Sequence, residues 1–72
     1  MKQNISGETI QRLRKQRGWS QKALAERMCE KGRNTTARNV SAMERGIHKV
    51  YDIDLLVLTE IFHVTVQELL KE

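Results

Sequence analysis

Three evenly spaced glycines, Gly18, Gly32 and Gly46, divide the first two thirds of this 72-residue chain. Glycine adopts the left-handed backbone conformation that closes a helix at little cost, so each of these positions predicts the end of a helix. The sequence contains no proline, and its apolar residues are mostly aliphatic. This composition favours helices over a β-sandwich. The chain is therefore predicted to be all-α.

Capping residues indicate where the helices begin. A cap flanked by two apolar residues forms a hydrophobic staple, which closes the first turn. This pattern occurs at four residues: Ser6, Ser20, Asp52 and Thr65. For Ser6 the two apolar residues are Ile5 and Ile10. Thr36 can cap a further helix. The start of this helix is the least determined by the sequence, because Thr35 is polar and no staple can form there. The expected helices are Gly7–Arg17, Gln21–Lys31, Ala37–Arg45, Ile53–Phe62 and Val66–Lys71.

Apolar residues form a stripe on each expected helix and predict the core. The stripes consist of Ile10, Leu13, Leu24, Ala25, Met28, Val40, Met43, Leu55, Leu56, Val57, Leu58, Ile61, Phe62, Leu69 and Leu70. The helix at 53–62 is apolar almost all round, which predicts that it is central and that the others pack against it. A chain of 72 residues is near the lower size for one self-sufficient core. We expect a single domain over residues 1–72, too small for an enzyme with a deep cleft.

The sequence offers no chemistry typical of catalysis or of metal binding. Cys29 is the single cysteine, so no internal disulfide can form, and no Cys/His spacing is typical of zinc. His48 and His63 have no partners at ligand spacing, and no phosphate loop or nucleophile motif occurs. We expect no enzyme activity, no cofactor, no metal and no small-molecule ligand. Without a signal peptide or an apolar run of roughly 18 residues, we expect a cytoplasmic protein that does not bind membranes.

Positive charge is concentrated in the first part of the chain. Residues 1–50 hold twelve of the thirteen Lys and Arg but four of the nine Asp and Glu, while residues 51–72 hold one and five. This distribution favours a basic face for a polyanion, with an acidic end directed away from it. A solvated charged surface is the alternative.

Residues 20–46 have the properties of a helix-turn-helix. Such a unit needs a small residue where two helices cross, and Ala25 supplies it, with Val40 and Met43 as apolar contacts from the second helix. If these are buried, the outer face of that second helix is polar and suited to the major groove. It carries Arg38, Asn39, Ser41, Ala42 and Arg45.

The stretches RLRKQRGWSQKALAERM, NVSAMERG and LLVLTEIFHVTVQELL resemble the lambda repressor-like, Cro-type (XRE) family over Gly7 to Leu70. The resemblance implies a compact five-helix bundle and a sequence-specific double-stranded DNA-binding regulator, a repressor of bacterial, phage or mobile-element origin. Two departures stand out. About five residues are added between Cys29 and Thr35, which lengthens the turn, and IHKVYDID after Gly46 replaces the frequent proline-containing loop.

The resemblance also implies roles for individual residues. Arg14 and Glu44 match a pair that forms an internal salt bridge. Base contacts are expected from Ala37, Arg38, Asn39, Ser41 and Ala42, and Arg38 is the strongest because arginine can bond guanine O6 and N7 together. Phosphate contacts are expected from Ser20, Gln21, Thr36, His48 and Lys49. Further candidates, for which a solvated surface is an equally good explanation, are Arg12, Lys15, Arg17, Lys22 and Arg33.

We expect a homodimer that binds a palindromic operator. Phe62, Val64 and Leu70 are possible interface residues, although core packing is the favoured use. Fold alone does not exclude a protein-interaction module, such as an antitoxin or a partner-binding regulator. The outer face of the helix at 37–45 separates the two functions, because a partner-binding groove should be apolar there. Its polar and basic residues favour DNA.

Overall fold

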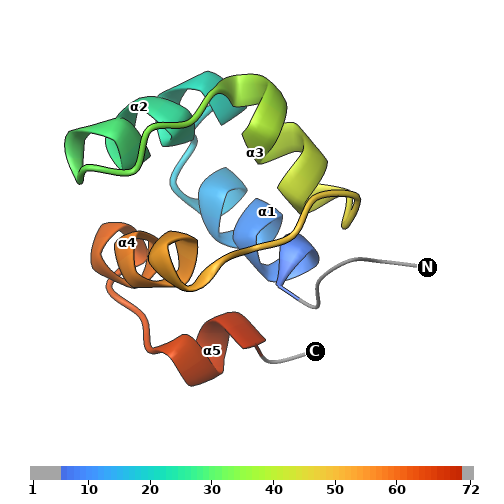
Figure 1. Ribbon diagram of the computed structural model, residues 1–72. Helices are drawn as coiled ribbons and strands as arrows, with labels where there is room; N and C mark the ends of the chain where they lie inside the picture. The colour runs from blue at the N-terminus through green and yellow to red at the C-terminus, as the bar shows by residue number, and fades with distance from the viewer. Residues whose placement is uncertain (1–5, 71–72) are drawn as a thin grey trace.

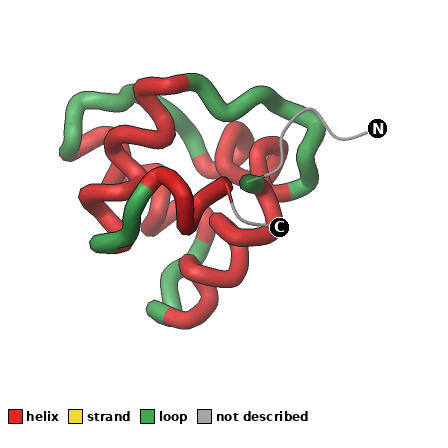
Figure 2. Tube along the Cα trace, turned by 90° about the horizontal axis from the view of Figure 1, so that it is seen from below, coloured by secondary structure: helices red, strands yellow, loops and turns green. Residues whose placement is uncertain are grey.

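The computed structural model describes residues 6–70, which form helices joined by loops, without strands in that range (Figures 1 and 2). The helices are α1 (Gly7–Gln16), α2 (Gln21–Glu30), α3 (Ala37–Glu44), α4 (Asp52–Phe62) and α5 (Val66–Leu70). The all-α prediction is confirmed, and each expected boundary that falls within residues 6–70 agrees with the structure to within one residue. Ile5 and Lys71, which also entered the predictions, lie outside the described residues. No helix in residues 6–70 is long and apolar enough to span a membrane.

The three glycines end helices as expected. At Gly32 the backbone has φ 94°, which a residue with a β-carbon adopts at a cost. Its N–H donates to Cys29 O, and the Arg33 N–H donates to Met28 O, both at 2.9 Å. These two bonds form a Schellman motif that satisfies the last carbonyls of α2. Gly18 and Gly46 close α1 and α3 with the same pair of bonds.

Three of the expected caps are present and two are different. Side-chain oxygens of Ser20, Thr36 and Thr65 accept the amides of Ala23, Asn39 and Glu68 at 3.0, 3.2 and 3.1 Å. Ser6 precedes α1 but its side chain makes no capping hydrogen bond. Asp52 is not the cap of α4, because α4 already begins at Asp52. Asp54 reaches back instead, and its Oδ2 accepts the Tyr51 N–H at 2.9 Å.

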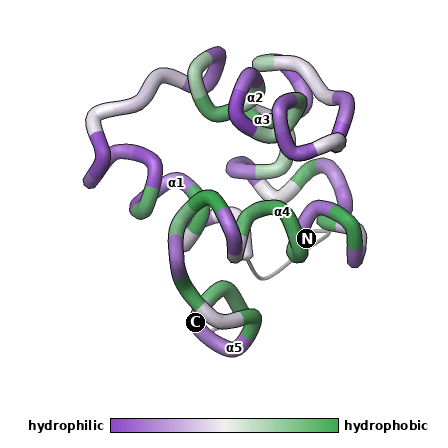
Figure 3. Tube along the Cα trace, turned by 90° about the vertical axis from the view of Figure 1, so that its left-hand side faces the viewer, coloured by the Kyte–Doolittle hydropathy of each residue, from purple (hydrophilic) through white to green (hydrophobic). Residues whose placement is uncertain are grey.

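The helices pack in a closed cycle around a shared core. The closest neighbours are α1 with α3, α3 with α2, α2 with α4, α4 with α5, and α5 with α1. The prediction that α4 is the central helix is therefore wrong. Much of α4 is hydrophobic (Figure 3), but only one side of it meets other helices, so Ile53 and Leu56 remain 48% and 59% exposed. The buried apolar residues are Ile10, Leu13, Leu24, Ala25, Met28, Val40, Met43, Val57, Leu58, Ile61, Phe62 and Leu69.

The start of α1 lies directly against the end of α3. A β-carbon added at Gly7 would be 2.5 Å from Met43 O and 2.8 Å from Glu44 O, both backbone atoms. Only a residue without a side chain fits there. Gly7 thus allows a backbone contact that places the end of α3 on α1, a role that the sequence pattern does not indicate.

Candidate nucleic-acid interface

The second and third helices pack as a helix-turn-helix. Ala25 on α2 is 4% exposed, and Val40 and Met43 on α3 are 0% and 2% exposed. Because these residues lie on the inner sides of the two helices, the crossing is the one that the sequence predicts. The two helices lie next to each other in Figure 1, with the long turn between them.

The residues expected to contact bases lie on the outer side of α3. Arg38 and Asn39 are exposed, while Ala37, Ser41 and Ala42 are half-buried. The first turn of α3, capped by Thr36, therefore presents the two longest polar side chains of this group to solvent. Arg45, at the other end of α3, is also exposed. This face is polar and basic, as a helix that enters the major groove requires.

A buried ion pair holds the end of α3. Arg14 Nε lies 2.6 Å from Glu44 Oε2, and Arg14 Nη2 lies 3.0 Å from Glu44 Oε1, a bidentate geometry. The two side chains are 9% and 0% exposed. Arg14 Nη1 also donates to the Trp19 carbonyl at 2.8 Å, which is in the loop after α1. The pair expected from the sequence thus joins α1, the loop and α3.

Gln21 connects this pair to the start of α2. Its Nε2 donates to Glu44 Oε1 at 3.1 Å, so the carboxylate receives three side-chain hydrogen bonds from two residues. Gln21 is half-buried, whereas its neighbours Ser20 and Lys22 are exposed. The start of α2, where phosphate contacts were expected, is therefore fixed relative to α3 by one buried carboxylate.

Several other residues expected at phosphates are open to solvent. Lys15, Thr36 and Lys49 are exposed, as is Arg12. His48 is half-buried, and its Nδ1 lies 2.8 Å from the Lys49 carbonyl. Its ring packs edge-on against Tyr51 at a centroid distance of 6.2 Å. The loop after α3 is thus ordered by local contacts that leave the Lys49 side chain accessible.

Arg17, another phosphate candidate, has a role inside the molecule. Its Nη2 donates to the Phe62 carbonyl at 2.6 Å, near the end of α4, where cations are favoured by the helix dipole. The guanidinium also lies 5.0 Å from the Phe62 ring centroid and 5.9 Å from that of Trp19. The two rings are stacked at 5.9 Å. The sequence shows no signal for the contacts with Phe62, because they join residues far apart in the chain.

The long turn, residues 31–36, is packed against the rest of the protein. The Cys29 thiol donates to Thr35 O at 3.3 Å and accepts from Thr35 N at 3.5 Å, which ties the end of the turn to α2. Arg33 Nε lies 2.6 Å from Asp54 Oδ1 on α4. The hydrogen bond that Arg33 donates to the Asp54 carboxylate raises the pKa of Arg33, whereas burial lowers it. The added residues thus contact both α2 and α4.

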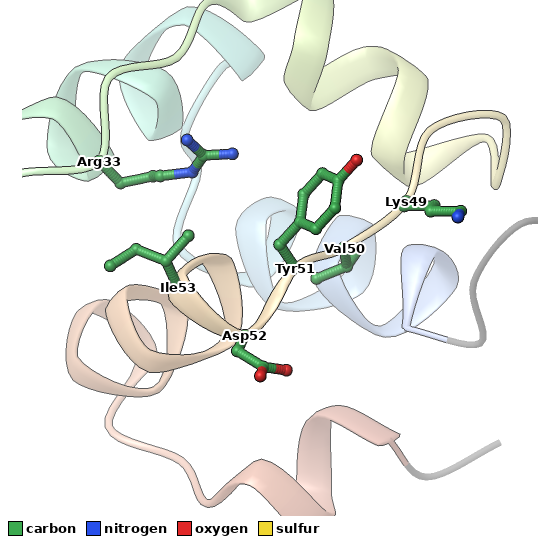
Figure 4. Close-up of a pocket in the computed structure, with 6 residues that line it drawn as sticks. All are labelled: Arg33, Lys49, Val50, Tyr51, Asp52 and Ile53. Carbon is green, nitrogen blue, oxygen red and sulfur yellow. The ribbon is translucent and has the colours of Figure 1, made fainter.

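An open groove of about 670 Å³ lies beside the contact between Arg33 and Asp54, along the loop before α4 and the first residues of α4. Its lining consists of Arg33, Lys49, Val50, Tyr51, Asp52 and Ile53 (Figure 4). Arg33 extends into it from the turn, and Lys49 lies at the other end (Figure 4). Within residues 6–70, no three His, Cys, Asp or Glu side chains are grouped so that they could hold a metal ion.

The arrangement of α2 and α3 is that of a helix-turn-helix protein. A comparison with known protein families identifies the family. The helix-turn-helix family of the XRE type, which includes lambda repressor- and Cro-like domains, matches residues 10–69. The chain belongs to this family and is a DNA-binding helix-turn-helix regulator. Neither curated proteins nor solved structures give a match.

Proposed function

We propose that the protein is a sequence-specific regulator of transcription that binds double-stranded DNA and represses its target genes. In this proposal α3 enters the major groove. The observation that carries it is the polar outer side of α3, with Arg38 and Asn39 exposed in the first turn of a helix whose inner side is fixed by buried contacts. The bacterial, phage or mobile-element origin rests on the family resemblance.

Each residue of the first turn of α3 has a chemical role in the proposal. Arg38 bonds guanine O6 and N7 together, and Asn39 bonds adenine or a phosphate. Ala37 or Ala42 contacts a thymine methyl group, and Ser41 supplies a further hydrogen bond. Phosphate contacts come from exposed or half-buried residues near these positions: Lys15, Ser20, Gln21, Lys22, Thr36, His48 and Lys49. Such contacts set the position of the protein without reading sequence.

The protein would act as a homodimer on a palindromic operator, with two copies of α3 about 34 Å apart in successive major grooves. Among the three residues considered for the interface, Phe62 is 1% exposed and Val64 packs against the core. Both therefore stabilise the fold of one protomer. Leu70 is 39% exposed and remains the candidate of the three.

Selection of binding sites from random duplexes tests the proposal. Enrichment of a roughly palindromic sequence at moderate salt is expected. Recovery of no common sequence would refute sequence-specific binding and would favour a protein-interaction function for the same fold.

Two substitutions then separate base contacts from phosphate contacts. Arg38→Ala should lower the preference at one or two operator positions, by about 1–3 kcal/mol at each. Lys15→Ala should weaken binding to all duplexes alike and reduce the dependence of affinity on salt. If both variants affected matched and mismatched duplexes equally, Arg38 would not be a base-contacting residue.

A further inference from the structure

The lengthened turn is joined to α4 by an ion pair on a buried carboxylate. Asp54 is 1% exposed, and its two oxygens have separate partners. Oδ1 lies 2.6 Å from Arg33 Nε in the turn, and Oδ2 accepts the Tyr51 N–H at 2.9 Å. One side chain therefore fixes both the turn and the first residues of α4. The backbone N–H of Arg33 donates to Met28 O at 2.9 Å. Arg33 therefore connects α2, the turn and α4.

This connection lies close to the DNA-facing end of α3. Arg33 precedes Thr36, the cap of α3, by three residues, and Arg38 and Asn39 follow in the first turn. The opposite end of α3 is held by Glu44, which is bonded to Arg14 and Gln21. The helix is thus fixed near both ends. If the contact at Arg33 were lost, the bonds between Thr35 and the Cys29 thiol would still hold the end of the turn on α2. The turn would no longer be held on α4, however, and the first turn of α3 could shift while Glu44 remained in place.

We propose that Arg33 and Asp54 are positioning residues for base recognition, because their ion pair holds the turn on α4 and so sets how the first turn of α3 meets the bases. The inference rests on the proposed function. It gives Arg33 a different role from the phosphate contact that the sequence suggested. The Asp54 carboxylate neutralises the guanidinium and so weakens its attraction for a phosphate.

The test compares Arg33→Met with Asp54→Asn. Arg33→Met keeps an unbranched apolar stem but removes the ion pair and one positive charge. Asp54→Asn keeps the shape and an acceptor for the Tyr51 N–H but removes the carboxylate, and it leaves Arg33 free. Lys31→Met is the matched control, because it removes a positive charge from the same turn, where the Lys31 ammonium group makes an exposed contact with Glu60 at 3.8 Å.

The measurement is the affinity of each variant for the duplex that the wild type selects and for single-base mismatches of it, over a range of salt concentrations. Folding is checked by circular dichroism, and the temperature is chosen so that the variants are folded. We expect Arg33→Met and Asp54→Asn each to reduce discrimination at the positions read by the first turn of α3 by about tenfold, comparable with one bidentate base contact. The double variant should be no worse than either single variant, because both remove the same contact. Lys31→Met should keep the wild-type preference.

A phosphate contact by Arg33 gives a different result. Arg33→Met would then weaken all duplexes alike and lower the slope of log affinity against log salt by about 0.9, while Asp54→Asn would keep the wild-type preference. That result would overturn the inference. If Arg33→Met does not fold, the result for Asp54→Asn is sufficient to test the inference. The wild type is assayed first: if it selects no sequence, the proposed function fails and the inference fails with it. If it selects one and Asp54→Asn retains full discrimination, only the inference fails.

Discussion

Substitution of Arg14 by alanine should strongly destabilise the fold. Arg14 makes two bonds to Glu44 and one to the Trp19 carbonyl, and the Glu44 side chain is fully buried. Arg14→Ala would leave this carboxylate with the hydrogen bond from Gln21 but without a cation. Removal of one partner of a buried pair costs about 3–5 kcal/mol. A domain of this size has a free energy of unfolding of only about 3–5 kcal/mol from its core, so the variant should be at the limit of stability.

Urea and thermal unfolding followed by circular dichroism measure this loss. For a domain of this size each kcal/mol shifts the Tm by about 4–8 °C, so a decrease on the order of 15–30 °C is expected. Lys31→Ala is the control, since the pair of Lys31 and Glu60 has side chains 47% and 61% exposed. Exposed pairs contribute about 0–1 kcal/mol, and this variant should unfold close to the wild type.

A second substitution separates the buried charge from the loss of packing. Arg14→Met combined with Glu44→Leu replaces both ions by apolar side chains, a change that is often neutral or stabilising for a buried pair. The double variant should regain much of the stability that Arg14→Ala loses, although Gln21 and the Trp19 carbonyl lose their partner. Where Arg14→Ala is folded, its base preference should change less than its stability. A loss below about 1 kcal/mol for Arg14→Ala would refute this reasoning.

Two further substitutions test contacts of α3. Gly7→Ala should destabilise the fold by about 1–3 kcal/mol, because the new β-carbon would meet two backbone carbonyls of α3 at 2.5 and 2.8 Å; unchanged thermal unfolding would show that the two helices separate freely. Thr36→Ala should cost about 1 kcal/mol, because Thr36 Oγ1 accepts the Asn39 N–H; Thr36→Ser, measured in the same urea titration, should recover most of it, and failure to do so would argue against a capping role.

Local signals in the sequence account for the helices. Gly18, Gly32 and Gly46 mark helix ends, and polar caps mark most of the starts, because both depend on the conformation of adjacent residues. The prediction fails at Asp52, where two nearby acidic residues could cap α4. Asp54 makes the capping bond. Asp54 also accepts from Arg33 Nε, a contact that the local pattern does not indicate.

The residues of the candidate site were also predictable only in part. The sequence predicts the outer face of α3 from a period of 3.6 residues, and it predicts the partners Arg14 and Glu44 only through a family resemblance. The expected phosphate contacts at Arg17 and Arg33 rest on charge alone. The structure places these two guanidinium groups against Phe62 O and Asp54, which charge and spacing in the sequence do not indicate.

The sequence by itself determined an all-α fold, the limits of its helices and the polar face of α3, because these properties arise from interactions among residues a few positions apart. Only the tertiary structure decided that α4 leaves Ile53 and Leu56 exposed. It also decided that the missing side chain at Gly7 lets the end of α3 pack against α1, and that Asp54 fixes the long turn. Each of these depends on residues distant in the chain, whose approach is set by the packing of whole helices.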